Sequence, residues 1–200
     1  SSAASDVYKR QVSDYLVPYT SSGCTAMCLY CYLVCNYNKC AYLRLFVNRE
    51  QMLDRLIKKS KNSEIPLTFE IGSNSDLVLE NTITNNLLYT IPRFAEEGAG
   101  SLTFPTKFHM VDSLLDLPHK GKVIFRMSVN PQRLISRIEL GTSSLEKRIE
   151  AVNRMCEAGY PCGLLIAPVM LVDGWKAMYT ELLEQLRDDL TEKAQKQMFL

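Results

Sequence analysis

Short apolar runs alternate with amphipathic segments along most of the chain, and this alternation limits the folds open to it. The runs are rich in β-branched and aromatic residues, as buried strands are, and they read DYLVPYT, PLTFEIG, SLTFPT, KVIFRMSV and CGLLIAPVML. Segments 48–61, 143–159 and 174–190 place apolar residues three and four apart, which predicts helices. Strands that alternate with helices form right-handed βαβ units. We therefore predict an α/β fold with a mainly parallel sheet, either an open doubly wound sheet or a full or partial barrel.

The two ends of the chain depart from this pattern. Residues 1–11, SSAASDVYKRQ, have no clear periodicity, and we interpret them as a non-native leader. The remaining residues, 12–200, form one predicted domain. The final QKQMFL turns apolar just after a polar helix, where another strand would begin. We therefore expect the domain to be a fragment, truncated at its C-terminus.

Composition excludes several classes of protein. With 46% hydrophobic and 22% charged residues the chain has the balance of a globular domain. A net charge of +1 gives no overall field for nucleic acid, so any such partner must meet a local patch. The sequence contains neither an apolar run long enough to span a membrane nor a signal peptide, so we expect a cytoplasmic protein without a membrane partner. Cysteines in that compartment serve as ligands, catalysts or small core residues more often than as disulfides.

Three of the seven cysteines have the spacing C-x-x-x-C-x-x-C, at Cys24, Cys28 and Cys31, in a loop after the first predicted strand. Thiolates at this spacing can hold one soft metal centre. Zinc is the weaker interpretation, because the chain has only two histidines to complete a site. Cys35 could supply a fourth ligand to an iron–sulfur cluster, and buried cysteines without a metal are the remaining alternative. Three ligands would leave one iron of a four-iron cluster open for chemistry.

This spacing is the signature of the radical S-adenosylmethionine superfamily. Five segments together resemble spore photoproduct lyases, between about Gly23 and Gly174, and they read GCTAMCLYCYL, YLRLFVN, LTFPTKFHMVDSLLDLPHKGKVIFRMSVN, GTSSLEKRIEA and AGYPCGLLIAPV. The resemblance implies a partial (β/α) barrel that binds a 4Fe-4S cluster and S-adenosyl-L-methionine (AdoMet). It also implies a monomeric DNA repair lyase that uses a 5′-deoxyadenosyl radical to reverse the spore photoproduct thymine dimer in ultraviolet-damaged DNA. Flavodoxin or ferredoxin would supply the electron.

The resemblance assigns the cluster to Cys24, Cys28 and Cys31. It implies that further residues contact AdoMet, each at or just beyond the end of a predicted strand, namely Ser75, Lys107, Ser128 and Ala167. Strand ends at the C-terminal side are where a barrel presents its ligand groups. The family's missing C-terminal part would include a hairpin that helps to hold the lesion. Within this chain, Lys39, Arg44 and Lys107 are basic residues that could meet DNA.

Three further positions concern the hydrogen atom that ends the reaction. Tyr30 and Tyr32 match a tyrosine pair that relays hydrogen atoms in the family, although tyrosines at such positions can also serve for packing. Packing against the cofactor is the favoured interpretation of Tyr30, and both interpretations stay open for Tyr32. Ser73 stands where many family members have the cysteine that donates hydrogen to the product radical. An alcohol O–H bond is much stronger than a thiol S–H bond, so we expect Ser73 not to replace that cysteine. Cys35 and Cys40 are possible substitutes.

Two other functions remain open from the sequence. One is a radical S-adenosylmethionine enzyme with a substrate other than DNA, which the serine at the donor position makes more credible. The other is a zinc-binding module without enzymatic activity. Product analysis separates the first from a DNA repair lyase, and metal analysis separates the second.

Overall fold

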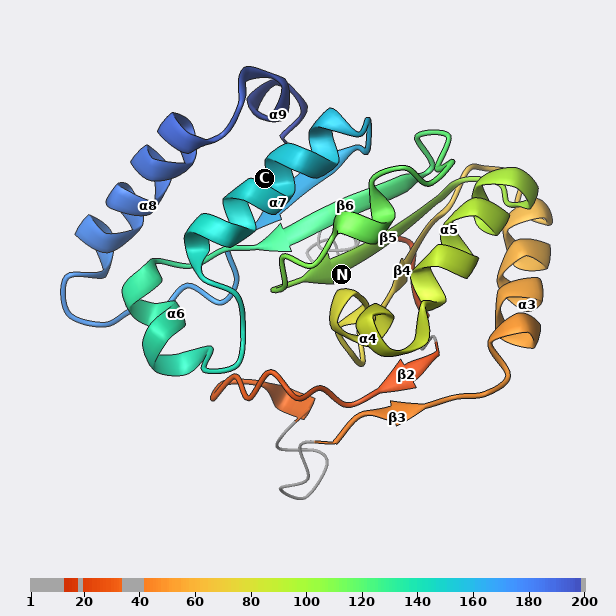
Figure 1. Cartoon of the computed structure of the whole chain (residues 1–200), viewed down its shortest axis with the longest axis horizontal. Coiled ribbons are helices and arrows are strands. Elements are labelled where there is room, and N and C mark those ends of the chain that lie inside the picture. The colour runs from red at the N-terminus through yellow and green to blue at the C-terminus, as the bar shows by residue number, and fades with distance from the viewer. Residues whose placement is uncertain (1–12, 18–19, 34–41, 199–200) are drawn as a thin grey trace, which may run out of the picture.

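The computed structural model describes residues 13–17, 20–33 and 42–198. Five strands form one parallel sheet, and they are β1 (Tyr15–Val17), β4 (Thr68–Ile71), β5 (Ser101–Thr106), β6 (Val123–Ser128) and β7 (Cys162–Leu165). Their order in the sheet, β1-β4-β5-β6-β7, follows the chain without a reversal (Figure 1). A doubly wound sheet reverses its order at a switch point, whereas a barrel does not. The sheet is therefore part of a (β/α) barrel, as the resemblance implied.

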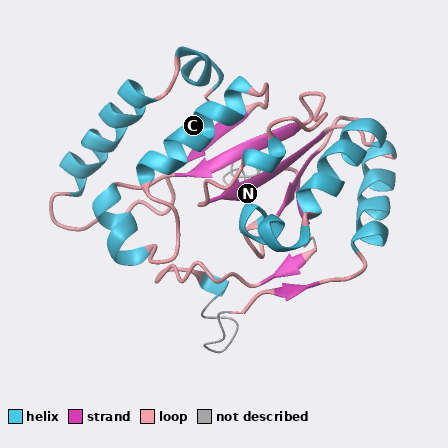
Figure 2. Ribbon diagram, viewed as in Figure 1, coloured by secondary structure: helices cyan, strands magenta, loops and turns pink. Residues whose placement is uncertain are grey.

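Helices follow most of the strands and cover the outer face of the sheet (Figure 2). The three predicted helices are confirmed within two residues at each end, as α3 (Arg49–Lys61), α7 (Leu145–Glu157) and α8 (Trp175–Asp189). Other helices were not predicted from the sequence, and they are α4 (Leu77–Thr84), α5 (Asn86–Glu97), α6 (Gln132–Ile138), α9 (Glu192–Gln197) and the 3-10 turn η1 (Asp112–Leu114). Among the described residues, no helix is long and apolar enough to cross a membrane.

A two-stranded antiparallel ribbon frames the cysteine loop. It pairs β2 (Ser21–Ser22) with β3 (Arg44–Leu45), and Ser21 lies opposite Leu45. The first predicted strand is thus shorter than expected, because β1 ends at Val17 and the chain then enters β2. Cys35, Lys39 and Cys40 lie outside the described residues, so their suggested roles stay predictions.

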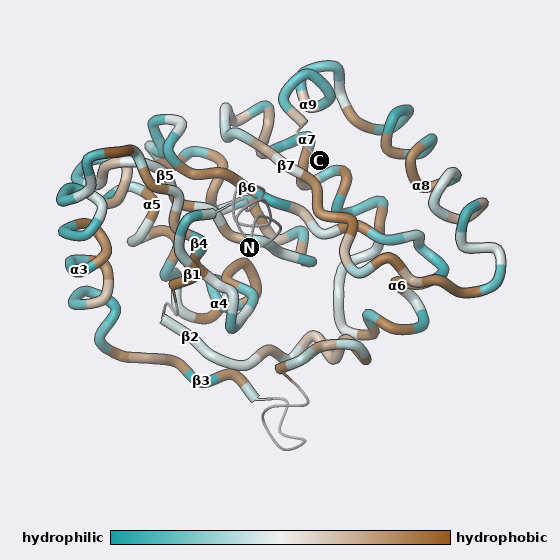
Figure 3. Tube along the Cα trace, turned by 180° about the vertical axis from the view of Figure 1, so that it is seen from behind, coloured by the Kyte–Doolittle hydropathy of each residue, from teal (hydrophilic) through white to brown (hydrophobic). Residues whose placement is uncertain are grey.

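The two faces of the sheet differ in polarity. On the face toward the helices, Phe69, Phe104 and Phe125 are completely buried. Alternate residues point to the opposite, inner face, where Arg126 donates to Thr103 Oγ1 at 2.7 Å and forms an ion pair with Glu70. Hydrophobic and hydrophilic residues alternate within the turns of outer helices such as α3 and α8, as they do in a helix with one buried side (Figure 3). The barrel interior is therefore polar enough to receive a polar ligand.

Candidate active site

A cavity of about 370 Å³ opens at the C-terminal ends of the strands. Ser73 and Ser75 follow β4, Lys107 follows β5 and Ser128 ends β6. The cavity is lined by eight of the ten residues that the resemblance assigned to the site, namely Cys24, Cys28, Cys31, Tyr32, Ser73, Ser75, Lys107 and Ser128. The fold thus brings together groups that are spread over more than one hundred positions of the sequence.

Backbone contacts hold the cysteine loop over the ends of the strands. Gly23 has a φ of +90°, and a Cβ atom there would lie 2.2 Å from the carbonyl oxygen of Tyr42, so only glycine fits. The amide of Gly23 donates to the carbonyl of Asn74 at 2.8 Å. Farther along, the amide of Leu29 donates to the carbonyl of Ile138 at 2.8 Å. The cysteine loop is therefore fixed at two points, to the loop that follows β4 and to the last residue of α6.

Burial favours the protonated form of two thiols of the loop. Burial raises the pKa of Cys24 to about 12 and that of Cys28 to about 11, while the nearby charge of Lys107 lowers the pKa of Cys28. Metal binding needs thiolates, so it would release these protons. Within the described part of the chain, no three His, Cys, Asp or Glu side chains are already arranged to hold a metal ion. Cluster loading would therefore have to reorient the three cysteine side chains and remove the protons of Cys24 and Cys28.

The donor set nevertheless fits an iron–sulfur cluster better than structural zinc. Three soft thiols line one cavity, and a closed zinc site needs a fourth protein ligand. Both histidines have other contacts. His109 Nδ1 lies 2.7 Å from Ser143 Oγ, and the ring of His119 stacks on Tyr160 at 3.8 Å. Neither lines the cavity, so no histidine of the described residues completes a closed zinc site there.

Asp76 places Lys107 beside the cysteines. Its carboxylate caps α4 by accepting from the amides of Val78 and Leu79 at 3.1 and 3.2 Å. It also accepts from Thr106 Oγ1 at 2.8 Å and from the amide of Lys107 at 3.0 Å. Burial raises the pKa of Asp76, and these bonds oppose the rise. We did not assign Asp76 to the site from the sequence, although an aspartate directly before an apolar helix is a recognisable N-cap signal.

The two tyrosines have different surroundings. The phenol of Tyr32 is half exposed at the cavity and donates to the carbonyl oxygen of Ser73 at 2.6 Å. The phenol of Tyr30 instead donates to Glu139 Oε1 at 2.5 Å, and Tyr30 does not line the cavity. Burial and the bond to Glu139 raise the pKa of Tyr30. Of the two interpretations weighed for Tyr30, this contact favours packing over hydrogen relay.

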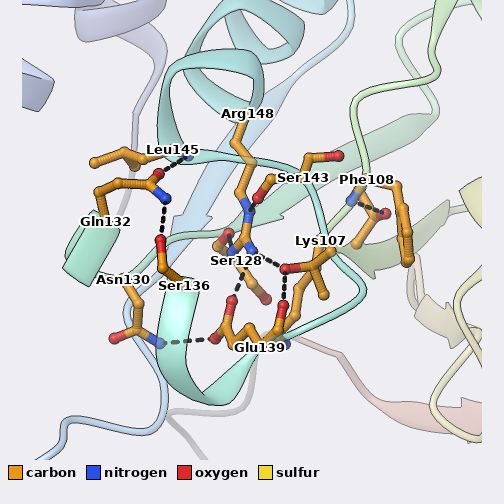
Figure 4. Close-up of polar contacts among 12 residues, drawn as sticks. Lys107, Phe108, Ser128, Asn130, Gln132, Ser136, Glu139, Ser143, Leu145 and Arg148 are labelled. Carbon is orange, nitrogen blue, oxygen red and sulfur yellow. Dashed lines mark hydrogen bonds and ion pairs between the residues drawn. The ribbon is translucent and has the colours of Figure 1, made fainter. Parts of the chain in front are cut away.

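Glu139 lies at the centre of a buried polar cluster behind the cavity (Figure 4). It accepts from Asn130 Nδ2 at 3.1 Å and forms an ion pair with Arg148 at 2.6 Å, in which both side chains are completely buried. Arg148 also donates to the carbonyl of Ser128 at 2.9 Å. Burial alone would raise the pKa of Glu139, but the charge of Arg148 and the three hydrogen bonds lower it. Through Tyr30 at one side and the carbonyl of Ser128 at the other, the cluster connects the cysteine loop to the end of β6. No sequence motif predicted this cluster.

Ala167 is the remaining residue that the resemblance assigned to the site. It follows β7 at the same edge of the sheet, it is exposed, and a cis peptide bond joins it to Pro168. It is not among the residues that line the cavity. The structure thus places Ala167 at the correct edge of the sheet without bringing it into the cavity, and its role stays a prediction.

Residues 6–200 match the family model described as Spore photoproduct lyase. The chain belongs to the spore photoproduct lyase family. It is 41% identical to the spore photoproduct lyase of Bacillus subtilis 168 over 175 residues, which are 87% of this chain and 51% of that relative. It is 34% identical to the Clostridium acetobutylicum protein over 182 residues, 90% of this chain and 54% of that protein. The chain therefore spans about half the length of these spore photoproduct lyases.

Solved structures of the family have the same fold. A variant of spore photoproduct lyase with bound AdoMet and dinucleoside spore photoproduct matches with a TM-score of 0.88 and 32% identity, over 94% of this chain and 56% of the other. A spore photoproduct lyase complexed with dinucleoside spore photoproduct matches with a TM-score of 0.85 and 33% identity, over 92% and 54%. Native anSMEcpe with bound AdoMet matches at 14% identity with a TM-score of 0.57, over 84% and 49%, a likeness of fold alone.

Proposed function

We propose that this chain is the cofactor-binding part of a spore photoproduct lyase, and that the whole protein reverses the spore photoproduct thymine dimer in ultraviolet-damaged DNA. One observation carries the proposal. Three cysteines at the radical S-adenosylmethionine spacing line the same cavity as Lys107 and Ser75, at the C-terminal edge of a partial barrel. Membership of the family supports the substrate.

Each group at the cavity has a part in this function. Cys24, Cys28 and Cys31 would hold a 4Fe-4S cluster, and Lys107 can pair with the carboxylate of AdoMet. When bound, the two cofactors supply a 5′-deoxyadenosyl radical that abstracts hydrogen from the substrate. Asp76 fixes the backbone of Lys107 through its amide, 3.0 Å from Asp76 Oδ2. The protein thus orients AdoMet beside the cluster by contacts from several strand ends.

Tyr32 is the group within the described residues best placed to return hydrogen to the product. Its phenol lies against the backbone of Ser73, the position at which many family members carry the donor cysteine. A phenol can release its O–H hydrogen as an atom, because the ring delocalises the resulting radical, whereas the alcohol of Ser73 cannot. Flavodoxin or ferredoxin as electron donor, a monomeric state and a cytoplasmic location complete the proposal.

Anaerobic reconstitution tests the cofactor assignment. We expect the protein to take up iron and sulfide and, once reduced, to cleave AdoMet to 5′-deoxyadenosine. Cys28→Ala should abolish both. Cys156→Ala is the matched control, because Cys156 is completely buried in the core and does not line the cavity. One tightly bound zinc per chain without labile sulfide would refute the cofactor assignment. Action of the full-length protein on a substrate other than damaged DNA would refute the proposed substrate.

A further inference from the structure

A chain of buried polar side chains lies behind Ser75. Ser21 Oγ is 2.8 Å from Ser75 Oγ and also within hydrogen-bonding distance of Glu80 Oε2. Ser21 and Glu80 are each 1% exposed, whereas Ser75 lines the cavity. These residues come from β2, the loop after β4, and α4. A buried carboxylate is thus connected to the cavity through two hydroxyl groups.

The contacts of Glu80 fix the direction of these hydrogen bonds. Thr20 Oγ1 accepts from Asn86 Nδ2 at 2.6 Å, so its own hydrogen is free to go to Glu80 Oε2 at 3.1 Å. Thr84 Oγ1 lies 3.2 Å from Glu80 Oε1. Burial raises the pKa of Glu80, and the hydroxyl donors and Arg49 oppose the rise. Several hydroxyls that converge on one carboxylate match its ionised form, which can only accept.

The hydroxyl of Ser21 has a single hydrogen. Since that hydrogen goes to the carboxylate of Glu80, the bond between the two serines must use the hydrogen of Ser75. Ser75 then turns only oxygen lone pairs toward the cavity. A group that carries N–H hydrogens can bind there, whereas a carboxylate would meet a lone pair and be repelled.

We infer that Glu80 and Ser21 are positioning residues that make Ser75 a hydrogen-bond acceptor for the amino group of AdoMet. The inference rests on the proposed function, because it requires AdoMet in this cavity. The methionine part of AdoMet has an amino group that donates and a carboxylate that only accepts. Ser75 is matched to the first, and the ammonium of Lys107, which has donors alone, is matched to the second. Ser75 and Lys107 thereby distinguish the amino group of the methionine part from its carboxylate, which fixes the orientation of the cofactor.

A double-mutant cycle tests whether Ser21 acts through Ser75. Ser21→Ala, Ser75→Ala and the double variant are reconstituted anaerobically, and AdoMet binding is measured by equilibrium dialysis. Each single variant should bind AdoMet about three- to tenfold more weakly, as expected for one hydrogen bond. The double variant should bind no more weakly than Ser75→Ala alone, because residues that share one interaction are not additive.

Two further variants separate this role from a structural one. Ser60→Ala removes another buried serine, which bonds to the carbonyl of Ile57 at 2.7 Å in α3, and it should leave AdoMet affinity unchanged. Glu80→Gln should bind AdoMet more tightly than Glu80→Met. The amide oxygen of glutamine can still accept from Ser21 while its NH₂ group donates to Thr84, whereas methionine offers no acceptor of comparable strength.

Several results would overturn the inference. One is that Ser21→Ala weakens binding by the same factor with and without Ser75, and another is equal affinity of the two Glu80 variants. Unchanged binding in Ser75→Ala would also overturn it, yet would leave the proposed function standing, because iron, sulfide and 5′-deoxyadenosine decide that separately. Failure of the wild-type protein to take up a cluster, in contrast, would reject the proposed function itself.

Discussion

At the scale of single residues, two tyrosines that flank the same cysteine make different contacts. Tyr30 donates to the buried carboxylate of Glu139, and Tyr32 donates to the carbonyl of Ser73 beside the cavity. From the sequence, packing against the cofactor is the favoured interpretation of Tyr30, whereas relay and packing are both open for Tyr32. The partner of Tyr30 lies 109 positions away along the chain, so its burial depends on the fold. We conclude that Tyr30 holds the cysteine loop in place, whereas Tyr32 lies half exposed at the cavity.

The different contacts predict different costs of removing each phenol oxygen. Tyr30→Phe should lower the free energy of unfolding by about 1.5–3 kcal/mol, the range for a hydrogen bond to a charged group. Tyr32→Phe should lower it by less than about 1 kcal/mol, because its neutral bond is half exposed to water. Urea denaturation of the two variants under the same conditions measures both values. Equal losses would contradict the separation of roles.

Ser73 predicts an effect on the product in a full-length protein that carries this sequence. Ser73→Cys should raise the yield of unmodified thymine, because a thiol hydrogen is transferred far more readily than an alcohol hydrogen. Tyr32→Phe, Cys35→Ala or Cys40→Ala should lower that yield only where Ser73 is retained, since residues that share a function are not additive. Repair in dithionite, followed by product analysis for a sulfinate adduct, provides the measurement. Clean thymine from all three variants would reject every substitute donor.

At the scale of elements, helices α4 and α5 were not predicted from the sequence, and the start of α4 positions the end of a strand. Asn85, Asn86 and Pro92 suggest breaks in a helical pattern, which is why the two helices were missed. In the structure Asn85 adopts a φ of 52° and forms the junction between the two helices, and Pro92 lies inside α5. Helix α4 is capped at its N-terminus by Asp76, whose carboxylate also accepts a hydrogen bond from Thr106 at the end of β5. The start of this helix therefore determines where Lys107 lies.

Substitution of Asp76 should affect both the helix and the cofactor. Asp76→Ala should cost about 1–3 kcal/mol of stability, since it removes the cap and the bonds to Thr106 and Lys107. It should also weaken AdoMet binding. Asp76→Asn should fall between the wild type and Asp76→Ala, because asparagine caps helices well but has a single acceptor oxygen. Urea denaturation and AdoMet titration measure the two effects. An asparagine variant as unstable as the alanine variant would exclude capping as the main contribution.

At the scale of the whole molecule, an ion pair crosses the inner face of the sheet. Arg126 on β6 pairs with Glu70 on β4 and bonds to Thr103 on β5, the strand between them. Only 3% of the Arg126 side chain and 13% of the Glu70 side chain is exposed. Both groups are thus largely desolvated, so each depends on the other for compensation.

Removal of one member of this pair should cost more than removal of both. Arg126→Met should destabilise the protein by about 3–5 kcal/mol, because it leaves a buried carboxylate without its partner. Addition of Glu70→Gln should recover a large part of that loss. Thermal and urea unfolding of the two single variants and the double variant provide the cycle. A double variant less stable than Arg126→Met would show that the two side chains do not compensate each other.

The sequence by itself determined those features that depend on neighbouring residues. Apolar runs and three- and four-residue periodicity located the five parallel strands and helices α3, α7 and α8, and the spacing of Cys24, Cys28 and Cys31 pointed to a soft metal centre. Local pattern suffices here, because backbone periodicity and ligand spacing act over a few residues. The same pattern left a doubly wound sheet and a barrel equally open.

Only the tertiary structure decided the strand order and the partners of the polar groups. The order β1-β4-β5-β6-β7 selects the barrel, and it depends on which distant strands pair. The tertiary structure also buries Glu139 against Arg148 and Tyr30, and Glu80 against Ser21. A charged residue on a helix looks like a surface residue in the sequence. It becomes part of a site only when the fold removes it from water, because burial then requires a partner that local sequence cannot name.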